Sequence, residues 1–181
     1  ALDIHVASAH LSRLTGRPVK MVLNREEVFL CTHQRHPAFI TLRTGVKKNG
    51  LLVSQELKAI IDGGAYSGSG SISLNIGARG LMTVYILPNI RYEGTRVFTN
   101  KPMGGPMRGH GAPQIRFAIE PQLDMIAKEL GIDPVDLRMK NLIYAGYDHP
   151  AKKQIGSCGL KEALLGVTTA LNWQQKQGKL P

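Results

Sequence analysis

Two long apolar runs, joined by a very short polar connection, constrain the fold of this chain more than any other feature. Residues 39–46 and 51–61 are rich in apolar and β-branched side chains, and they flank Lys47-Lys48-Asn49-Gly50. Asn-Gly tolerates the positive φ angles of a tight turn, so the pattern predicts a β-hairpin. We expect strands at residues 19–23 and 92–99 to share its sheet.

Apolar residues also recur at three- and four-residue spacings in segments that stop at glycine or follow a capping residue, as in amphipathic helices. The predicted helices lie at residues 4–14, 115–130, 134–140 and 160–171, with a capped helix start at Asn24. Pro121 falls inside the longest segment, so we expect a kink or a restart there. The helices that contain Ile4 and follow Gln114 should cover the sheet. The expected fold class is α+β, a mixed sheet with a β-hairpin packed by helices.

The charge balance raises anions as partners. The 181 residues include 23 Lys and Arg against 13 Asp and Glu, a formal net charge of +10. A positive field concentrates nucleic acids, acidic cofactors and anionic membranes near the surface. The basic residues are dispersed, however, without the block that is typical of a nucleic-acid-binding arm. A basic α+β module that binds nucleic acid or another polyanion is therefore the alternative hypothesis, and nucleic acid is not the expected partner.

Hydropathy and cysteine content indicate in which cellular compartment the protein lies. No stretch approaches the roughly 18 apolar residues of a membrane span, so we expect none. Cys31 and Cys158 are too few and too far apart in sequence to form a disulfide scaffold, which favours a cytoplasmic protein. The chain begins at Ala1 without an initiator Met, and we interpret it as a segment of a longer protein.

Two glycine-rich loops are the main candidates for function, at residues 63–71 and 100–113. The second contains Gly104-Gly105-Pro106-Met107-Arg108-Gly109-His110-Gly111 immediately before a predicted helix. Backbone N–H groups at a helix N-terminus suit an anion such as a phosphate or a metal-oxo group. The loop matches neither a Walker loop nor a dinucleotide fingerprint. A structural turn into the helix is the alternative.

Three further candidates carry weaker signals. Cys31, His33 and His36 are metal-capable, but no second pair follows at zinc spacing. We expect His36 to lie in an extended loop and Cys31 to pack as a small hydrophobic residue. Arg79 is a lone cation among small and apolar residues, where it could meet a substrate carboxylate or carbonyl; a surface arginine is the alternative.

A series of motifs occurs in one order along nearly the whole chain: Thr15-Gly16-Arg17-Pro18-Val19-Lys20, Asn24-Arg25-Glu26-Glu27, Lys48-Asn49-Gly50, Asp62-Gly63-Gly64-Ala65-Tyr66, Met107-Arg108-Gly109-His110-Gly111-Ala112-Pro113-Gln114, and Gly131-Ile132-Asp133-Pro134 through Arg138, Asn141 and Leu142. This series resembles the molybdopterin-binding large subunit of the xanthine oxidase family. Within that family, the chain is most similar to 4-hydroxybenzoyl-CoA reductase large subunits in three places: the sequence of residues 107–111, the Gly-Gly-Ala-Tyr loop and residues 157–181.

The resemblance implies part of the molybdenum cofactor-binding domain of a molybdenum hydroxylase or dehydroxylase. Residues 1–142 would belong to the first molybdopterin-binding domain, and residues 143–181 would form a linker and the start of the second. The implied activity is oxidoreduction at an aromatic, heteroaromatic or aldehyde carbon. The implied cofactor is molybdenum-molybdopterin in its cytosine dinucleotide form, with electrons moving through 2Fe-2S and FAD.

The resemblance also implies roles for individual residues. Met107, Arg108, Gly109, His110 and Gly111 would bind the cofactor through backbone N–H groups, with no direct metal ligand. His110 would also contact the small-molecule substrate, and it replaces an aromatic residue of xanthine-type members, which disfavours a purine.

Arg79 would contact the substrate as well, although it is not in clean register with the family's arginine. The catalytic glutamate would lie outside this chain, which would be inactive alone. The implied partners are the rest of the large subunit, an iron–sulfur subunit and an FAD subunit.

Overall fold

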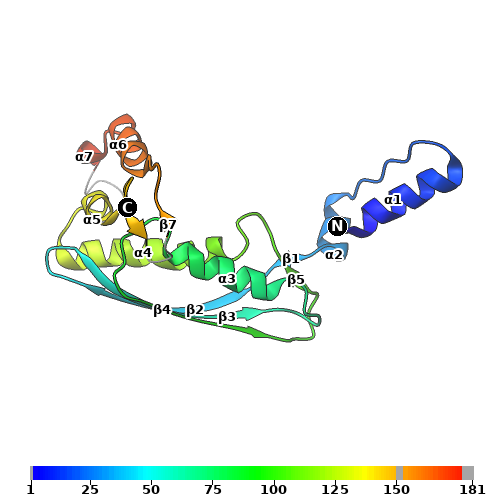
Figure 1. The fold of residues 1–181 in the computed structure, drawn as a ribbon, viewed down its shortest axis with the longest axis horizontal. Helices are drawn as coiled ribbons and strands as arrows, with labels where there is room; N and C mark the ends of the chain where they lie inside the picture. The colour runs from blue at the N-terminus through cyan, green and yellow to red at the C-terminus, as the bar shows by residue number, and fades with distance from the viewer. Residues whose placement is uncertain (1, 150–152, 177–181) are drawn as a thin grey trace.

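A three-stranded mixed sheet forms the base of the molecule in the computed structural model, which describes residues 2–149 and 153–176 (Figure 1). Its strands are β2 (Ala38–Val46), β3 (Leu52–Asp62) and β4 (Ile90–Val97), in the order β2-β3-β4. β2 and β3 are antiparallel, and Gly50 in their turn has a φ of 84°. β4 runs parallel to β3. The predicted hairpin and the strand near residues 92–99 are therefore confirmed.

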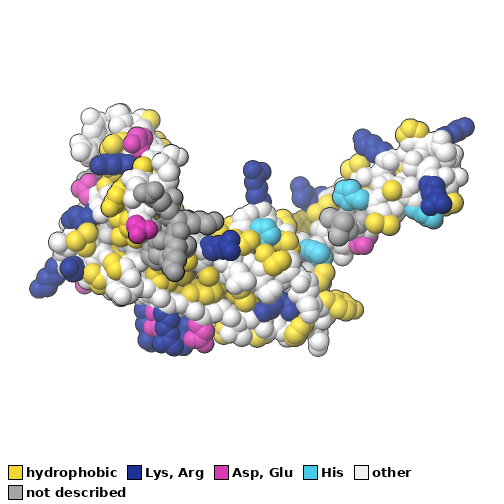
Figure 2. All heavy atoms as spheres, viewed as in Figure 1, with side chains coloured by type: hydrophobic (Ala, Val, Ile, Leu, Met, Phe, Trp, Pro, Cys, Tyr) yellow, Lys and Arg dark blue, Asp and Glu magenta, His cyan; other side chains and the backbone are white. Residues whose placement is uncertain are grey.

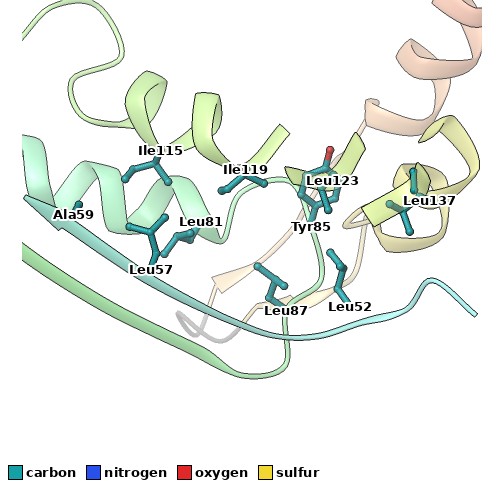
Figure 3. Close-up of a cluster of buried hydrophobic side chains, with 11 residues drawn as sticks. Leu52, Leu57, Ala59, Leu81, Tyr85, Leu87, Ile115, Ile119, Leu123 and Leu137 are labelled. Atoms are coloured by element: carbon teal, nitrogen blue, oxygen red, sulfur yellow. The ribbon is translucent and has the colours of Figure 1, made fainter. Parts of the chain in front are cut away.

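Two helices pack on one face of this sheet, α3 (Gly70–Leu81) and α4 (Ala112–Leu130). α3 lies in the connection between the parallel strands β3 and β4, which is the usual way to join such strands. A core cluster fills the space between the layers. Leu57, Leu81 and Ile119 are almost completely buried there and point toward one another (Figure 3). The core therefore fixes both helices over the sheet.

α4 is 19 residues long and continues through Pro121 without interruption, so of the two predicted outcomes, a kink or a restart, the restart is wrong. Proline removes a hydrogen bond to the carbonyl of Phe117, four residues earlier. Both residues are exposed, so water can satisfy that carbonyl. The helix ends at Gly131, whose φ of 65° is a left-handed C-cap, as the sequence predicted.

An N-terminal arm comprises α1 (Leu2–Thr15) and α2 (Arg25–Cys31) and extends away from the sheet (Figure 1). Both helices were predicted, and Asn24 forms the expected capping box with Glu27. The expectation that α1 covers the sheet is wrong. The predicted strand at residues 19–23 is also wrong, because no strand in the described part of the chain lies beside it to complete its backbone hydrogen bonds.

The C-terminal part packs at one end of α4. The predicted helices are present as α5 (Pro134–Asn141) and α6 (Leu160–Ala170), followed by α7 (Trp173–Lys176). In the same part, β6 (Asp148–His149) pairs with β7 (Lys153–Gln154). Elsewhere in the chain, β1 (Gln34–Arg35) pairs with β5 (Gly104–Gly105). The Asp133 carboxylate caps α5 and accepts a hydrogen bond from the Trp173 indole at 2.9 Å. Across residues 2–149 and 153–176, no helix is both long and apolar enough to cross a bilayer.

Candidate functional site

The loop at residues 100–113 follows a defined path into α4. Its Gly104–Gly105 part is β5, which pairs in parallel with β1. A tight turn follows, in which the His110 N–H donates to the Met107 carbonyl at 2.7 Å and the Ala112 N–H donates to the Gly109 carbonyl at 3.0 Å. Gly109 has a φ of 88°, which glycine adopts without steric cost. The loop is therefore an ordered turn that leads directly into a helix.

His110 has an unusual conformation within this turn. Its φ is 50°, the left-handed region that non-glycine residues rarely occupy. Its Nδ1 atom is buried and has no hydrogen-bond partner in the part of the chain that the structure describes. Strained residues of this kind persist where their surroundings fix them, and they cluster at ligand sites.

The turn presents free backbone donors next to a helix N-terminus. Arg108 and Gly109 are exposed, and neither N–H takes part in a backbone hydrogen bond within the described residues. Gly111, the N-cap of α4, provides no side-chain cap. The His110 N–H, by contrast, is already used in the turn. Among the described residues, the turn therefore uses one N–H group of the predicted run from Met107 to Gly111, that of His110, and the others remain for an anion.

Asp62 joins the two glycine-rich loops, and sequence reasoning did not single it out. Its side chain, only 8% exposed, accepts hydrogen bonds from the Gly64 N–H at 3.0 Å, the Thr99 hydroxyl at 2.6 Å and the Lys101 ammonium at 2.8 Å. These donors, with Lys101 foremost, hold the pKa of the Asp62 carboxyl well below its usual range. An acidic residue at the end of a strand and directly before Gly-Gly was the available signal.

Asp62→Asn should flatten the acid dependence of stability. Because the pKa of Asp62 is lowered on folding, its stabilisation is complete above its ordinary value of 3.8 and is lost as the pH falls from there toward the lowered pKa. In thermal unfolding, the stability of the wild type should therefore fall more steeply below about pH 5 than that of Asp62→Asn. Asp148→Asn, at an exposed carboxylate, is the control. Parallel pH profiles for wild type and Asp62→Asn would contradict the role of this carboxylate.

The other sequence candidates lie apart from this turn. Arg79 is exposed in the last turn of α3, and no hydrogen bond or ion pair joins it to residues 107–111 in the described regions. His36 lies in the short connection between β1 and β2, as expected, but it is buried there, and its Nδ1 donates to the Asp62 carbonyl at 2.9 Å. Cys31 is exposed, which contradicts the expected packing, because the arm that carries it stands away from the core. Among the described side chains, no group of three His, Cys, Asp or Glu could hold a metal ion.

Comparison with known proteins identifies the family of this chain. Residues 1–142 match the family model of the molybdopterin cofactor-binding domain. The chain belongs to this molybdopterin-binding family. It is 36% identical over 179 residues to the xanthine dehydrogenase molybdenum-binding subunit of Escherichia coli O157:H7, covering 98% of this chain and 24% of that protein. It is 37% identical over 145 residues to the nicotinate dehydrogenase large molybdopterin subunit of Eubacterium barkeri, covering 80% and 34%.

Solved structures agree with the family and the fold. The aldehyde oxidoreductase from Desulfovibrio gigas matches 92% of this molybdopterin-binding chain and 19% of its own, with 34% sequence identity and a TM-score of 0.75. The expected α+β fold of a molybdenum hydroxylase domain is therefore confirmed. The chain spans about a quarter to a third of the length of the two curated relatives above.

Proposed function

We propose that this chain binds molybdenum-molybdopterin through the turn at Arg108 and Gly109, as one part of a molybdenum-dependent oxidoreductase. The observation that carries the proposal is the turn directly before α4, in a chain of the molybdopterin-binding family: Arg108 and Gly109 are exposed there, and their N–H groups make no backbone hydrogen bond within the described residues. The positive end of a helix dipole and free N–H groups favour phosphate and metal-bound oxygen. The residues present therefore fit the cofactor.

The chemistry would be divided between the cofactor and this chain. When bound, the cofactor supplies oxygen transfer and electron exchange at a substrate carbon. The backbone of Arg108 and Gly109 would orient the anionic part of the cofactor, with Met107 and Gly111 completing the binding turn. His110, whose buried Nδ1 has no partner among the described residues, would hydrogen-bond to cofactor or substrate, and Arg79 would contact the substrate. The catalytic carboxylate would come from outside this chain.

The same proposal extends to the finer identity of the protein. The cofactor would be the cytosine dinucleotide form, and electrons would pass through 2Fe-2S and FAD on partner subunits or domains in the cytoplasm. The sequence of residues 107–111 supports a 4-hydroxybenzoyl-CoA reductase-like subtype, although the relatives above are named for other substrates. An aromatic, heteroaromatic or aldehyde carbon is the proposed point of reaction.

Within the larger subunit, residues 1–142 would form part of the first molybdopterin-binding domain, and residues 143–181 would form a linker and the start of the second. The end of the family match at residue 142 supports this division. The exposed apolar side chains of the N-terminal arm support burial against the rest of the subunit: Val6, Leu14, Val22, Phe29 and Leu30 are between 61% and 75% exposed.

Metal analysis of the intact subunit, meaning the complete protein in which this sequence occurs, tests the proposal. We expect about one molybdenum per chain together with the fluorescence of an oxidised pterin. In the view of Figure 2, Lys and Arg side chains are spread along the molecule and are not gathered in one area. A preparation without molybdenum that binds DNA or RNA with a steep salt dependence would instead favour the polyanion-binding alternative.

The 181-residue chain by itself should hold no stoichiometric molybdenum and catalyse no turnover with an artificial electron acceptor. An affinity that several converging loops provide is mostly lost when one loop remains, because the costs of association and ordering persist while contacts disappear. Metal analysis of the purified chain checks this expectation. Stoichiometric cofactor with turnover would contradict it.

A further inference from the structure

The Arg35 guanidinium donates hydrogen bonds to two backbone carbonyls of the candidate cofactor turn. Arg35 belongs to β1, yet one of its terminal nitrogens, Nη2, donates to the Arg108 carbonyl at 2.9 Å, and the other, Nη1, donates to the His110 carbonyl at 2.7 Å. Nη1 also lies 3.3 Å from the Gln114 side-chain oxygen. A planar guanidinium can satisfy two such acceptors at once, whereas an ammonium group is a single point charge. Arg35 therefore holds both sides of Gly109.

These hydrogen bonds determine where the free donor points. The Arg108 carbonyl and the Gly109 N–H belong to one planar peptide unit, and the described residues contain no cis peptide bonds. In a trans peptide, the C=O and N–H bonds point in opposite directions. Because Arg35 holds the carbonyl toward β1, the Gly109 N–H must face the other way. The hydrogen bond from Arg35 to the His110 carbonyl fixes the peptide unit between His110 and Gly111, and it helps to hold His110 at its positive φ.

We propose that Arg35 is a positioning residue that fixes the Gly109 N–H toward the cofactor without touching the cofactor itself. The cofactor part of this inference rests on the proposed function; the orientation of the turn does not. β1 has a second connection to the same loop, because it pairs with β5 at the start of the loop. Gln114 in turn donates to the His36 carbonyl at 3.2 Å. The loop is thus anchored to β1 at its start and at its end.

Arg35→Lys in the intact subunit tests the proposal, with Arg43→Lys as a matched control. Arg43 lies on β2 with its side chain 80% exposed, and among the described residues it forms an ion pair only with Glu56, at 3.6 Å, so the same substitution there leaves the turn intact. Trypsin cuts after arginine, and cleavage between Arg108 and Gly109 reports how often the turn opens. We expect cofactor-free Arg35→Lys to be cut there about tenfold faster or more than wild type and Arg43→Lys.

Molybdenum content provides the second measurement. Arg35→Lys grown with molybdate should retain less than about a third of the wild-type molybdenum, while Arg43→Lys retains all of it. Wild-type rates of cleavage at Arg108 would overturn the proposal, as would equal acceleration at Lys48, which would indicate general unfolding. Wild-type molybdenum content in Arg35→Lys would also overturn it. Absence of molybdenum from the wild-type subunit would refute the proposed function alone, since the cleavage rates would still test the orientation of the turn.

Discussion

Gly111→Ala should destabilise the fold by about 3 kcal/mol, the upper end of what overpacking a well-filled contact costs. A Cβ at Gly111 would overlap the Ser73 carbonyl oxygen of α3 and would also lie 3.3 Å from the Gly77 backbone nitrogen. These atoms belong to helix backbone, which cannot rotate away as a side chain does. α3 and α4 would have to separate, and the core between them would loosen. Chemical unfolding of wild type and variant measures the difference.

Gly166→Ala is the matched control for that substitution. Gly166 lies inside α6, and a Cβ there would meet no atom within 4 Å. Alanine favours a helix interior by about 0.5–1 kcal/mol over glycine, so this variant should be as stable as wild type or more so. Equal stability of Gly111→Ala and wild type would show that the helices do not approach as closely as the structure has them.

Gly109→Val in the intact subunit should lower the molybdenum content to below about a tenth of wild type while the fold survives. The φ of 88° disfavours any side chain, and a Cβ would lie 2.8 Å from the Pro113 ring. A branched side chain would also fill the space in front of the exposed N–H groups. Metal analysis and circular dichroism of the same preparation measure both expectations.

Gly146→Val separates backbone strain from loss of the site. Gly146 has a φ of 87°, nearly that of Gly109, but lies in the exposed turn before β6, with open space around it. Valine should impose a similar strain there, and the molybdenum content should remain at the wild-type value. If both variants keep their molybdenum, Gly109 is not at the cofactor; if both lose it, strain alone accounts for the effect.

The local elements were predictable because their signals lie within a few residues of one another. Asn49-Gly50 predicted the hairpin, Asn24 with Glu27 the capping box, and Gly131 the end of α4, and each depends on contacts between near neighbours. α3 was missed. Its segment contains three glycines, which weaken helix propensity, and its helical form depends on close contact with α4.

Long-range contacts account for what the sequence could not predict. The apolar residues at positions 19–23 resemble a strand, but a strand requires a partner that this chain does not provide in its described part. Asp62 was overlooked because its side-chain donors, Thr99 and Lys101, lie 37 and 39 residues further along the chain. Arg35 was overlooked because its partners lie 73 to 79 residues further along. Spacing alone cannot bring such pairs together. The sequence of residues 107–111 indicated the family, whereas the direction in which their N–H groups point could be seen only in the three-dimensional structure.

Anomalous X-ray scattering at the molybdenum absorption edge, from crystals of the intact subunit, locates the metal relative to this turn. We expect a single strong molybdenum peak with cofactor density on the face of the turn that carries the Arg108 and Gly109 N–H groups, opposite Arg35. Molybdenum and cofactor bound elsewhere, with those two N–H groups facing solvent, would contradict it.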